Sequence, residues 1–537
     1  MNTVVEESVR NAPEKNGAPD FSEVLAAAGP GTRVRIPAGV YHEPLVIRRG
    51  GEAGNPLRIE AAGDGEAVFS GSDRMTDWTL AGANRYRTAF RMEAEQRLEK
   101  HFGVITLPVQ IWVDGRRLRL VDSPDELTAN SFAYDGADLW MQLEDGLDPY
   151  QSDVQVARRG NMLRLEADHV ILTGITVTRC AASVQVGAAE VRGDHVTVED
   201  CGFSDTAGGV GVKFRGRHLT VRRNEIHHNG QMGFAFLGVR SVFEENFVHD
   251  NDLRNFCDHP VAEWNVWESG GGKVAYSRDC VFRRNRFVDN RHGPGLWLDI
   301  DNYRNRIESN YFARNGHSSI MVEISYDNVV CNNIIVDTLQ SNYSGSGILV
   351  QLSSRTRVYH NLVYRAAGYG VHLRWHVRQR DIHPYNPADP EAFARKHGFR
   401  QEDWMAPDGD YPVKENDVRN NVLVDCLGGS LFIDFHSSLT ESNTSDYNLH
   451  WNSRSLHPMA GGHRLLEWQA ITGLDEHSIY SKEMHRGPLF IDPDNGDFRP
   501  HAEGPLARRV PCVEAVGADF LGRAREADAT PGPFEMA

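Results

Sequence analysis

The sequence predicts an all-β fold: a right-handed parallel β-helix with an inserted antiparallel β-sandwich. Three observations predict it: an Asn recurs at a regular spacing, a short β-rich run leads to each Asn, and polar residues, often with a Gly, follow it. The repeated residue stands at Asn224, Asn246, Asn285, Asn310, Asn333, Asn361 and Asn421, with gaps of 22, 39, 25, 23, 28 and 60 residues. A basic period of 22–25 residues, interrupted by longer gaps, is typical of a β-solenoid.

The residues of each repeat favour strands over helices. Runs such as VILTGITVTRC and HLTVRRN are short, β-branched and alternating, whereas helical repeats show a spacing of about 3.6 residues. One coil cannot bury its own apolar face, but stacked coils can. Asn tolerates the left-handed backbone conformation, and its amide can bind the Asn of the next coil, so we expect a ladder of Asn side chains.

A second strand recurs between these phrases and should stack into one parallel sheet. Its copies are GVKFR (211–215), GFAFL (233–237), GLWLDID (295–301), SIMVEIS (319–325), GILVQLS (347–353), GVHLRWH (370–376) and SLFIDFH (430–436). Because side chains alternate between the two faces of a strand, the outward residues of this sheet should form a column that crosses the coils.

The period divides the chain into five segments. Residues 1–18 read as a disordered segment or arm, and 19–74 as an N-terminal cap with a short amphipathic helix and the first coils. Residues 75–152 contain aromatic strands joined by DG turns, which predict the β-sandwich. Residues 153–484 form the main β-helix, with a long loop at 378–414 and a short helix near Glu391–His397; 485–537 form a closing strand and tail. A loop of that length is usually functional or disordered.

Composition limits the classes of function. The 537 residues carry a net charge of −17, which argues against nucleic acid and anionic membranes as partners and is neutral toward a sugar. The N-terminus lacks a basic and an apolar signal region, and no stretch reaches about 18 apolar residues. We therefore expect a cytoplasmic protein, and a homo-oligomer remains open. The seven cysteines are odd in number and form no CxxC pair, so we expect small buried residues rather than disulfides or a zinc site.

Three acidic residues are candidates for catalysis. Glu268 lies in WNVWESGGGK, Asp299 in GLWLDID and Glu323 in SIMVEIS, with spacings of 31 and 24 residues. The second spacing is one coil, so Asp299 and Glu323 should project from adjacent strands about 4.8 Å apart. Two such carboxylates do not both ionise readily, and a retaining glycosidase uses that difference, with one group as nucleophile and the other as acid and base. We expect Glu268 to polarise or position the substrate.

Polar and aromatic side chains around this pair are candidates for binding an oligosaccharide. We expect Trp297 and Trp375 to lie in the same strand column, where exposed tryptophans suit stacking on sugar rings. The polar residues extend the column into a groove. The 39-residue spacing between Asn246 and Asn285 includes an inserted segment that we expect to form a wall beside this groove, and His259 lies in that segment. The predicted substrate-binding residues are Trp297, Asp301, Lys273, Gln351, Arg374, Trp375, His259 and Asp434.

The segment GLWLDIDNYRNRIESNYFARNGHSSIMVEISYDNVVCNN resembles the core motif of glycoside hydrolase family 120, the β-xylosidases. The resemblance implies that Asp299, in WLDI, is the nucleophile and that Glu323, in MVEIS, is the acid/base. An upstream acidic residue of that family matches Glu268 more loosely. The family also has a β-sandwich inserted near the N-terminal end of its β-helix. Asp301 stands where the family's pattern is apolar. From the spacing of the acid pair and the resemblance together, we expect retaining, exo-acting hydrolysis of a β-xyloside-like or related glycoside, with no metal or cofactor. The expected cytoplasmic location favours a short oligosaccharide as the substrate.

Three alternatives remain open. In a polysaccharide lyase, Asp299, Asp301 and Glu323 would bind Ca²⁺ and Lys273 or Arg374 would act as the base. An intramolecular fructosyl transferase could use the same scaffold. A carbohydrate-binding β-helix without catalysis would need the tryptophan-lined groove but not the acid pair.

Overall fold

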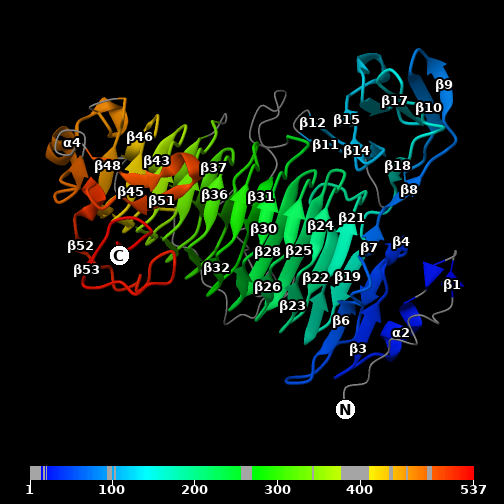
Figure 1. The fold of residues 1–537 in the computed structure, drawn as a ribbon, viewed down its shortest axis with the longest axis horizontal. Helices are drawn as coiled ribbons and strands as arrows, with labels where there is room; N and C mark the ends of the chain where they lie inside the picture. Colours follow the sequence, from blue (N-terminus) through cyan, green and yellow to red (C-terminus); the bar gives the residue numbers. More distant parts are fainter. Residues whose placement is uncertain are drawn as a thin grey trace. The chain divides into compact units, whose positions relative to one another are not determined.

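The computed structural model describes residues 14–15, 18–19, 21–92, 99–101, 104–255, 269–340, 344–376, 411–434, 440–454, 457–480 and 487–536. It is a right-handed parallel β-helix with an inserted β-sandwich, as predicted (Figure 1). The chain divides into two compact units. The first comprises residues 1–215, 223–235 and 250–269, and the second comprises residues 216–222, 236–249 and 270–537.

The first unit begins with a short helix, α2 (Ser22–Ala27), which buries Val24 and Leu25. Three parallel sheets then form the coils, and their inward residues alternate with outward ones. The first sheet holds β3 (Arg33–Ile36), β6 (Leu57–Ala61), β20 (Val170–Thr173) and β23 (Thr197–Glu199). The second holds β4 (Gly39–Tyr41), β7 (Ala67–Ser70), β21 (Ile175–Thr178), β24 (Gly202–Ser204) and β27 (Glu225–His227), and the third holds β5 (Leu45–Ile47), β19 (Leu163–Glu166), β22 (Gly187–Arg192) and β25 (Val210–Arg217).

The insertion is a sandwich of two sheets. One contains β8 (Ser72–Arg74), β13 (Ile111–Val113), β14 (Arg116–Arg117) and β18 (Val154–Ala157), and the other contains β9 (Thr79–Gly82), β10 (Arg85–Ala89), β15 (Arg119–Leu120), β16 (Ser131–Tyr134) and β17 (Asp138–Gln142). Side chains of both sheets, among them Ile111, Val156, Phe132 and Met141, form one buried core. Its strands run from residue 72 to 157, beyond the predicted 75–152, and β15 pairs with β16 in parallel rather than antiparallel.

Two partly buried arginines join the sandwich to the neighbouring coils of the same unit. Arg254 donates from Nε to the carbonyl of Ala207 (2.8 Å) and from Nη2 to that of Val109 (2.7 Å). Arg117 donates to the carbonyls of Thr206 and Ala207, at 3.1 Å each. Burial lowers the pKa of Arg117 to about 10. The guanidinium groups therefore satisfy carbonyl groups that the junction removes from water.

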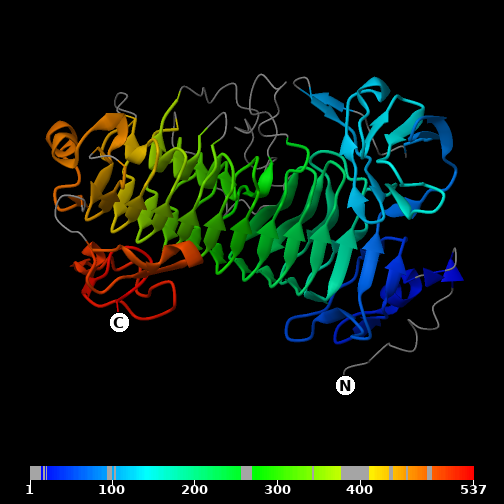
Figure 2. The same cartoon turned by 45° about the horizontal axis from the view of Figure 1, so that its top comes forward.

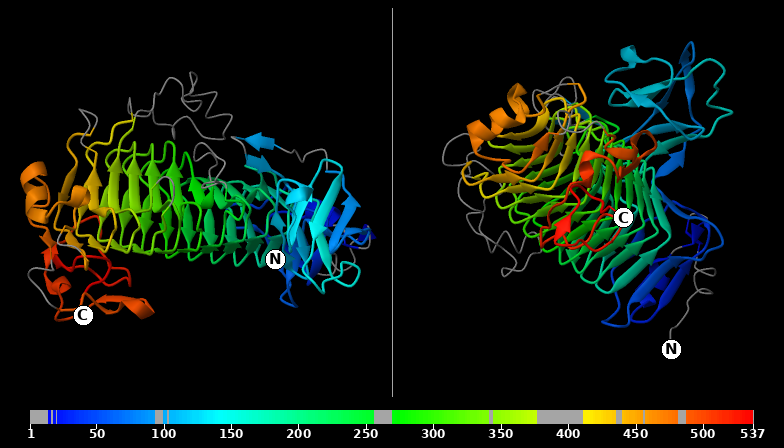
Figure 3. Two further views of the ribbon diagram at one scale, coloured as in Figure 1. Left: turned by 90° about the horizontal axis from the view of Figure 1, so that it is seen from above. Right: turned by 60° about the vertical axis from the view of Figure 1, so that its left-hand side comes forward.

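The second unit also contains coils built from three parallel sheets (Figure 3). The sheet that carries the predicted site contains β31 (Gly270–Val274), β34 (Leu296–Asp299), β37 (Ser318–Glu323), β40 (Ser346–Gln351), β43 (Tyr369–Arg374) and β46 (Gly429–Ile433). A second sheet contains β26 (Thr220–Arg222), β29 (Val242–Glu244), β32 (Val281–Arg283), β35 (Arg306–Glu308), β38 (Val329–Cys331), β41 (Arg357–Tyr359), β44 (Asp417–Arg419) and β47 (Thr444–Asp446). The third contains β30 (Phe247–His249), β33 (Arg286–Val288), β36 (Tyr311–Ala313), β39 (Ile334–Val336), β42 (Leu362–Tyr364), β45 (Val422–Val424), β48 (Leu449–Trp451) and β49 (Ile479–Tyr480).

The predicted asparagine ladder is present in this unit. From Asn246 each side-chain amide donates to the Oδ1 of the next Asn, through Asn285, Asn310, Asn333, Asn361, Asn421 and Asn448, at 2.9–3.0 Å. The predicted backbone role was wrong, because the left-handed residue is the one before the ladder Asn, for example Arg284 (φ 54°) and Ser309 (φ 53°). The ladder Asn therefore contributes hydrogen bonds between coils, and not a left-handed backbone conformation of its own.

The last coil closes around a buried carboxylate. Asp475 accepts hydrogen bonds from Ser445 Oγ (2.8 Å), Ser478 Oγ (2.7 Å) and Trp468 Nε1 (3.0 Å), and its Oδ1 lies 3.3 Å from His450 Nε2. Trp468 lies on α4 (Leu465–Thr472). Burial raises the pKa of Asp475, but the charge of His450 and the hydrogen bonds together outweigh it and hold the pKa at about 2.

The C-terminal segment packs along one flank of the second unit (Figure 2). It contains two antiparallel hairpins, β50 (Phe490–Asp492) with β51 (Asp497–Pro500) and β52 (Val510–Pro511) with β53 (Asp528–Ala529). Phe490 and Phe498 pack against side chains of the third sheet, such as Leu362. Arg525 donates to Asn332 Oδ1 (2.9 Å), and Asn332 donates to the carbonyl of Ala518 (2.7 Å). The predicted closing strand and tail therefore form an ordered wrap.

Six of the seven cysteines lie in described residues, and none of the six forms a disulfide. Five are buried, and burial raises the pKa of each of these thiols to about 12: Cys180, Cys201, Cys280, Cys331 and Cys426. Across the described ranges, no helix is both long enough and apolar enough to span a bilayer.

Candidate active site

Asp299 and Glu323 occupy equivalent positions on neighbouring strands. Asp299 ends β34, Glu323 ends β37, and the two residues are direct partners in the parallel pairing. Leu298 and Val322, which precede them, are fully buried in the interior of the β-helix. Because alternate residues face opposite sides of a strand, both carboxylates point outward. The predicted separation of Asp299 and Glu323 by one coil is confirmed.

In the described ranges, the side chains of Lys273, Trp297 and Gln351 contact these carboxylates. Lys273 on β31 places its Nζ 2.7 Å from Asp299 Oδ2, and the same ammonium lies 4.7 Å from the centre of the Trp297 ring. Trp297 Nε1 donates to Glu323 Oε2 at 3.1 Å, and Gln351 Nε2 donates to Glu323 Oε1 at 2.8 Å. Asp299 thus has a cation beside it, and Glu323 accepts hydrogen bonds from two neutral donors.

The carboxylates face outward but are shielded from bulk water. Asp299 is 3% exposed, Glu323 5% and Gln351 0%. In such surroundings charge–charge interactions and hydrogen bonds are stronger than at an open surface. The orientation of each carboxyl group is therefore fixed by its contacts.

The residue after each carboxylate has a strained backbone. Ile300 (φ 62°) and Ile324 (φ 47°) lie in the left-handed region, which is unusual for β-branched residues. The amide of Ile300 donates to the carbonyl of Glu323 (3.1 Å), and that of Ile324 to the carbonyl of Gln351 (3.1 Å). The coil-to-coil hydrogen bonds hold this turn, so the strand ends, and the chain bends, directly after each acid.

Trp375 does not occupy the predicted column of Trp297. The residue in register with that column on β43 is His372, reached through Met321 and Leu349. Trp375 comes after β43 ends and packs against a buried cluster of the left-handed turn residues, which includes Tyr276, Ile300, Ile324 and Leu352. The prediction failed because the seven-residue segment 370–376 contains both the strand and the turn.

The other predicted binding residues lie around the same sheet. Gln351 and Arg374 continue the Asp299–Glu323 column in register, whereas Lys273 is the register partner of Trp297 and reaches Asp299 diagonally. Asp301 is buried in the turn after β34 rather than in the column, with φ 53°. Asp434 follows β46 and accepts a hydrogen bond from the amide of Trp375 (2.9 Å).

Two predicted residues, Glu268 and His259, lie outside the described residues, as does the loop segment 377–410 with its predicted helix. Their predicted roles remain predictions.

Sequence reasoning missed a second outward column, two residues before the carboxylates. It contains Trp297, Met321, Leu349, His372 and Phe432, in register across five strands. Burial, with a smaller effect of Arg374, lowers the pKa of His372 to about 3, so this imidazole is neutral at physiological pH. The alternation of the predicted strands could have revealed the column.

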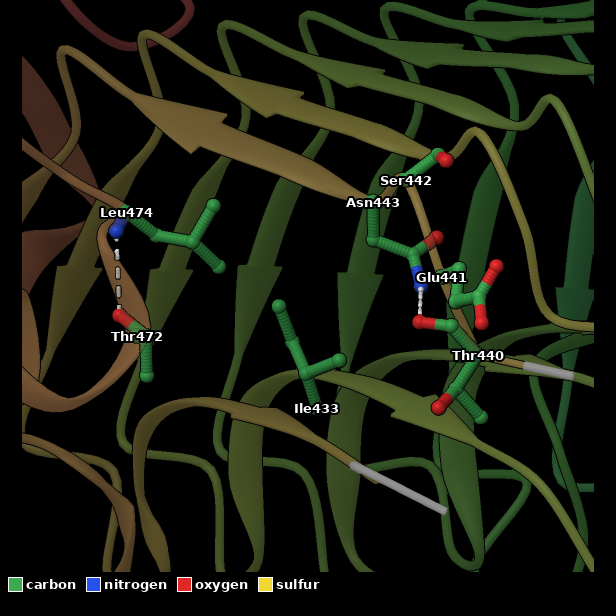
Figure 4. Close-up of a pocket in the computed structure, with 7 residues that line it drawn as sticks. All are labelled: Ile433, Thr440, Glu441, Ser442, Asn443, Thr472 and Leu474. Carbon is green, nitrogen blue, oxygen red and sulfur yellow. Dashed lines mark hydrogen bonds between the residues drawn. The ribbon is translucent and has the colours of Figure 1, made fainter. Parts of the chain in front are cut away.

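A hollow of about 290 Å³ lies elsewhere in the second unit (Figure 4). Its lining consists of Ile433, Thr440, Glu441, Ser442, Asn443, Thr472 and Leu474. None of these is a predicted site residue, and the candidate site remains the outward face of the sheet β31–β46.

The comparisons with known proteins agree with this class of fold. A family model described as a right-handed β-helix region matches residues 183–338, and no curated protein matches. The solved complex of XylC with xylose is 13% identical, covers 98% of this chain and 96% of its own, and has a TM-score of 0.67. Pectate lyase Pel9A is 11% identical (98% and 95% covered, TM-score 0.44), and the A-module of the mannuronan C-5 epimerase AlgE4 of Azotobacter vinelandii is 15% identical (89% and 96% covered, TM-score 0.45). At 13% identity the likeness to XylC shows the fold alone.

Proposed function

We propose that the protein is a retaining glycoside hydrolase in which Asp299 is the nucleophile and Glu323 the acid/base. The observation that carries the proposal is the register of the two outward carboxylates on adjacent strands. A strand spacing of about 4.8 Å is close to the separation of about 5–5.5 Å that a double displacement needs, and shorter than the roughly 6.5–9.5 Å of inverting enzymes. The fold shared with XylC, solved with xylose, supports a sugar as the ligand.

In the first step, an Asp299 oxygen attacks the anomeric carbon as the bond to the leaving oxygen breaks, and Glu323 gives its proton to that oxygen. In the second step, Glu323 takes a proton from water, the water oxygen attacks the anomeric carbon, and the bond to Asp299 breaks. The products are the free sugar and the alcohol, and both carboxyl groups return to their initial state.

The neighbouring contacts suit these roles. The Lys273 ammonium, 2.7 Å from Asp299, stabilises the anion that attacks. The Gln351 amide contains a donor and an acceptor, so after rotation its oxygen can accept a hydrogen bond from the carboxyl group of neutral Glu323. Trp297 holds the other Glu323 oxygen in place.

The main alternative is β-elimination by a lyase. It would need Lys273 or Arg374 as a neutral base. Lys273 is held between the Asp299 carboxylate and the Trp297 ring, and both contacts favour the charged ammonium. This arrangement favours the hydrolase.

A panel of aryl α- and β-glycosides of pentoses and hexoses tests the proposal through release of the aryl alcohol. We expect turnover of at least one glycoside, and proton NMR should show retention in the first product. Asp299→Asn and Glu323→Gln should each lower kcat by about a thousandfold or more, and azide should rescue Glu323→Gln. The control Glu308→Gln, on β35 of another sheet, should retain activity. An inverted first product, or full activity in Asp299→Asn, would refute the mechanism. An unsaturated product from a uronate polymer, abolished by a chelator, would favour the lyase.

A further inference from the structure

Three aromatic side chains gather on the outward face of the last two strands of the site sheet. Tyr369 and His372 lie on β43, and Phe432 lies on β46. The rings of Tyr369 and Phe432 are stacked, with centroids 4.9 Å apart and planes at 28°. The His372 ring contacts both, at 4.8 Å from Tyr369 and 5.1 Å from Phe432. The predicted site residues do not include any of the three.

This aromatic cluster is outside the core of the β-helix. Val371 and Leu373 flank His372, and Leu431 and Ile433 flank Phe432; all four are buried in the interior. His372 and Phe432 therefore face outward. Tyr369 lies on the same side because its ring contacts both of them. Tyr369 and Phe432 are only partly buried, so ring surface remains available to a ligand.

The imidazole adds a polar group to the cluster. His372 is 8% exposed, and its Nε2 has no hydrogen-bond partner among the described residues. Buried polar atoms nearly always have a partner, so such an atom beside accessible ring surface points to a ligand hydroxyl or an ordered water. A neutral imidazole can accept or donate that hydrogen bond.

The position of the cluster relative to the carboxylates defines the class of ligand. Strands β37, β40, β43 and β46 are consecutive in the sheet, so β43 and β46 lie two and three strand spacings from Glu323, or about 10 and 14 Å. A sugar ring in an extended chain advances by close to one strand spacing. Arg374, in the column of Glu323 and partly exposed, supplies hydrogen-bonding groups along the interval.

We propose that Tyr369, His372 and Phe432 form a distal subsite that stacks on a sugar ring two or three residues from the cleaved bond. The substrate class is then an oligosaccharide of at least three residues, lying along the coils, rather than a simple glycoside. The apolar face of a pyranose would lie on the Tyr369–Phe432 pair, and a ring hydroxyl would bind His372 Nε2. The identity of this site as part of a hydrolase rests on the proposed function, but binding at the cluster does not.

The test measures affinity against chain length. Calorimetry of Glu323→Gln with β-1,4-linked xylo-, gluco- and manno-oligosaccharides of one to five residues should show, for one series, an increase in affinity of about tenfold on lengthening from two to four residues. Phe432→Ala, added to Glu323→Gln, should remove this increment while binding of the disaccharide stays unchanged. Tyr369→Phe retains the aromatic ring and should retain the increase in affinity with chain length. Leu427→Ser, at a position 71% exposed, is the surface control.

Each outcome decides the matter. Affinity that does not depend on length, or an increment that survives in Phe432→Ala, overturns the distal subsite. The circular dichroism spectrum and the urea midpoint of the variant show that it is folded, and His372→Phe, which keeps a ring and removes Nε2, should weaken the longer ligands about three- to tenfold. Length-dependent binding without turnover of any glycoside would overturn the proposed function and leave the subsite standing.

Discussion

Replacing one asparagine of the ladder by alanine should destabilise the second unit far more than the small volume of the removed side chain suggests. Asn310 is fully buried, and its side chain takes part in four hydrogen bonds. Its Oδ1 accepts from the backbone and side-chain amides of Asn285 (3.0 and 2.9 Å), and its Nδ2 donates to the Phe282 carbonyl (2.9 Å) and to Asn333 Oδ1 (3.0 Å).

In Asn310→Ala two buried backbone groups lose these bonds, the Asn285 amide and the Phe282 carbonyl. Each unsatisfied buried group costs about 1–3 kcal/mol, and the vacated volume adds a smaller cost. We therefore expect a loss of about 3–5 kcal/mol in the free energy of unfolding, measured by urea denaturation followed by circular dichroism. The exposed Asn495, which hydrogen-bonds only near its own turn, provides the control: Asn495→Ala should cost less than about 0.5 kcal/mol.

The double variant Asn285→Ala/Asn310→Ala sharpens the test. The two residues share two of the four bonds, so the double loss should fall short of the sum of the single losses by about 1 kcal/mol or more. A loss below about 1 kcal/mol for Asn310→Ala, or strict additivity in the double variant, would refute the idea that the side-chain bonds between coils stabilise the fold.

Three further predictions follow from the described residues. First, the folded structure lowers the pKa of Asp475 from its ordinary value of 3.8 to about 2. The ionised carboxylate therefore contributes about 2 kcal/mol to the free energy of unfolding. This contribution is complete above pH 3.8 and is lost as the pH falls toward 2. Acid titration of Asp475→Asn, compared with the native chain, should show a shallower loss of stability between pH 4 and 2, and identical slopes would contradict this. Second, the five buried thiols with a pKa of about 12 should resist a maleimide at neutral pH in the folded protein, reacting at least about a hundredfold slower than the partly exposed Cys512; peptide mapping by mass spectrometry measures this, and equal rates would count against a rigid core. Third, a Cβ on Gly193 would lie 2.0 Å from the Ala167 carbonyl oxygen, whereas a Cβ on Gly29 meets nothing within 4 Å; Gly193→Ala should lower the thermal midpoint by several degrees and Gly29→Ala should not, and equal midpoints would show that the coil can shift to accept the methyl group.

Much of the fold could be predicted because each coil must bury an apolar face and satisfy the hydrogen bonds of its turn, and it does so with the same pattern of residues. The ladder Asn, the alternation of apolar residues and the period predicted the sheets and the one-coil relation of Asp299 to Glu323. The Asn is conspicuous in sequence since an amide that binds two neighbouring coils has no simple substitute. The DG turns predict the sandwich, and its ends differ from the prediction by a few residues because β8 and β18 lie at its two chain ends and pair with each other.

The contacts of the site could not be predicted in the same way. The contact of Lys273 with Asp299 is diagonal across the sheet. It depends on the length of the lysine side chain and on the register of β31 with β34, which the sequence alone does not reveal. Trp375 was assigned to the sheet because the pattern does not reveal that β43 ends at Arg374. The left-handed Ile300 and Ile324 run against local preference, and only the hydrogen bonds between coils explain them. The aromatic cluster required the register of β43 with β46, which brings His372 opposite Phe432.

Each coil adds one residue to each outward column, so positions along the β-helix are separated by whole strand spacings. The carboxylate pair lies on β34 and β37, and the aromatic cluster lies on β43 and β46, with the single strand β40 between the two groups. Duplication of that intervening coil would move the cluster by one strand spacing and leave the acids untouched. Preference for substrate length could therefore change in whole sugar units through gain or loss of a repeat, with no redesign of the reacting groups.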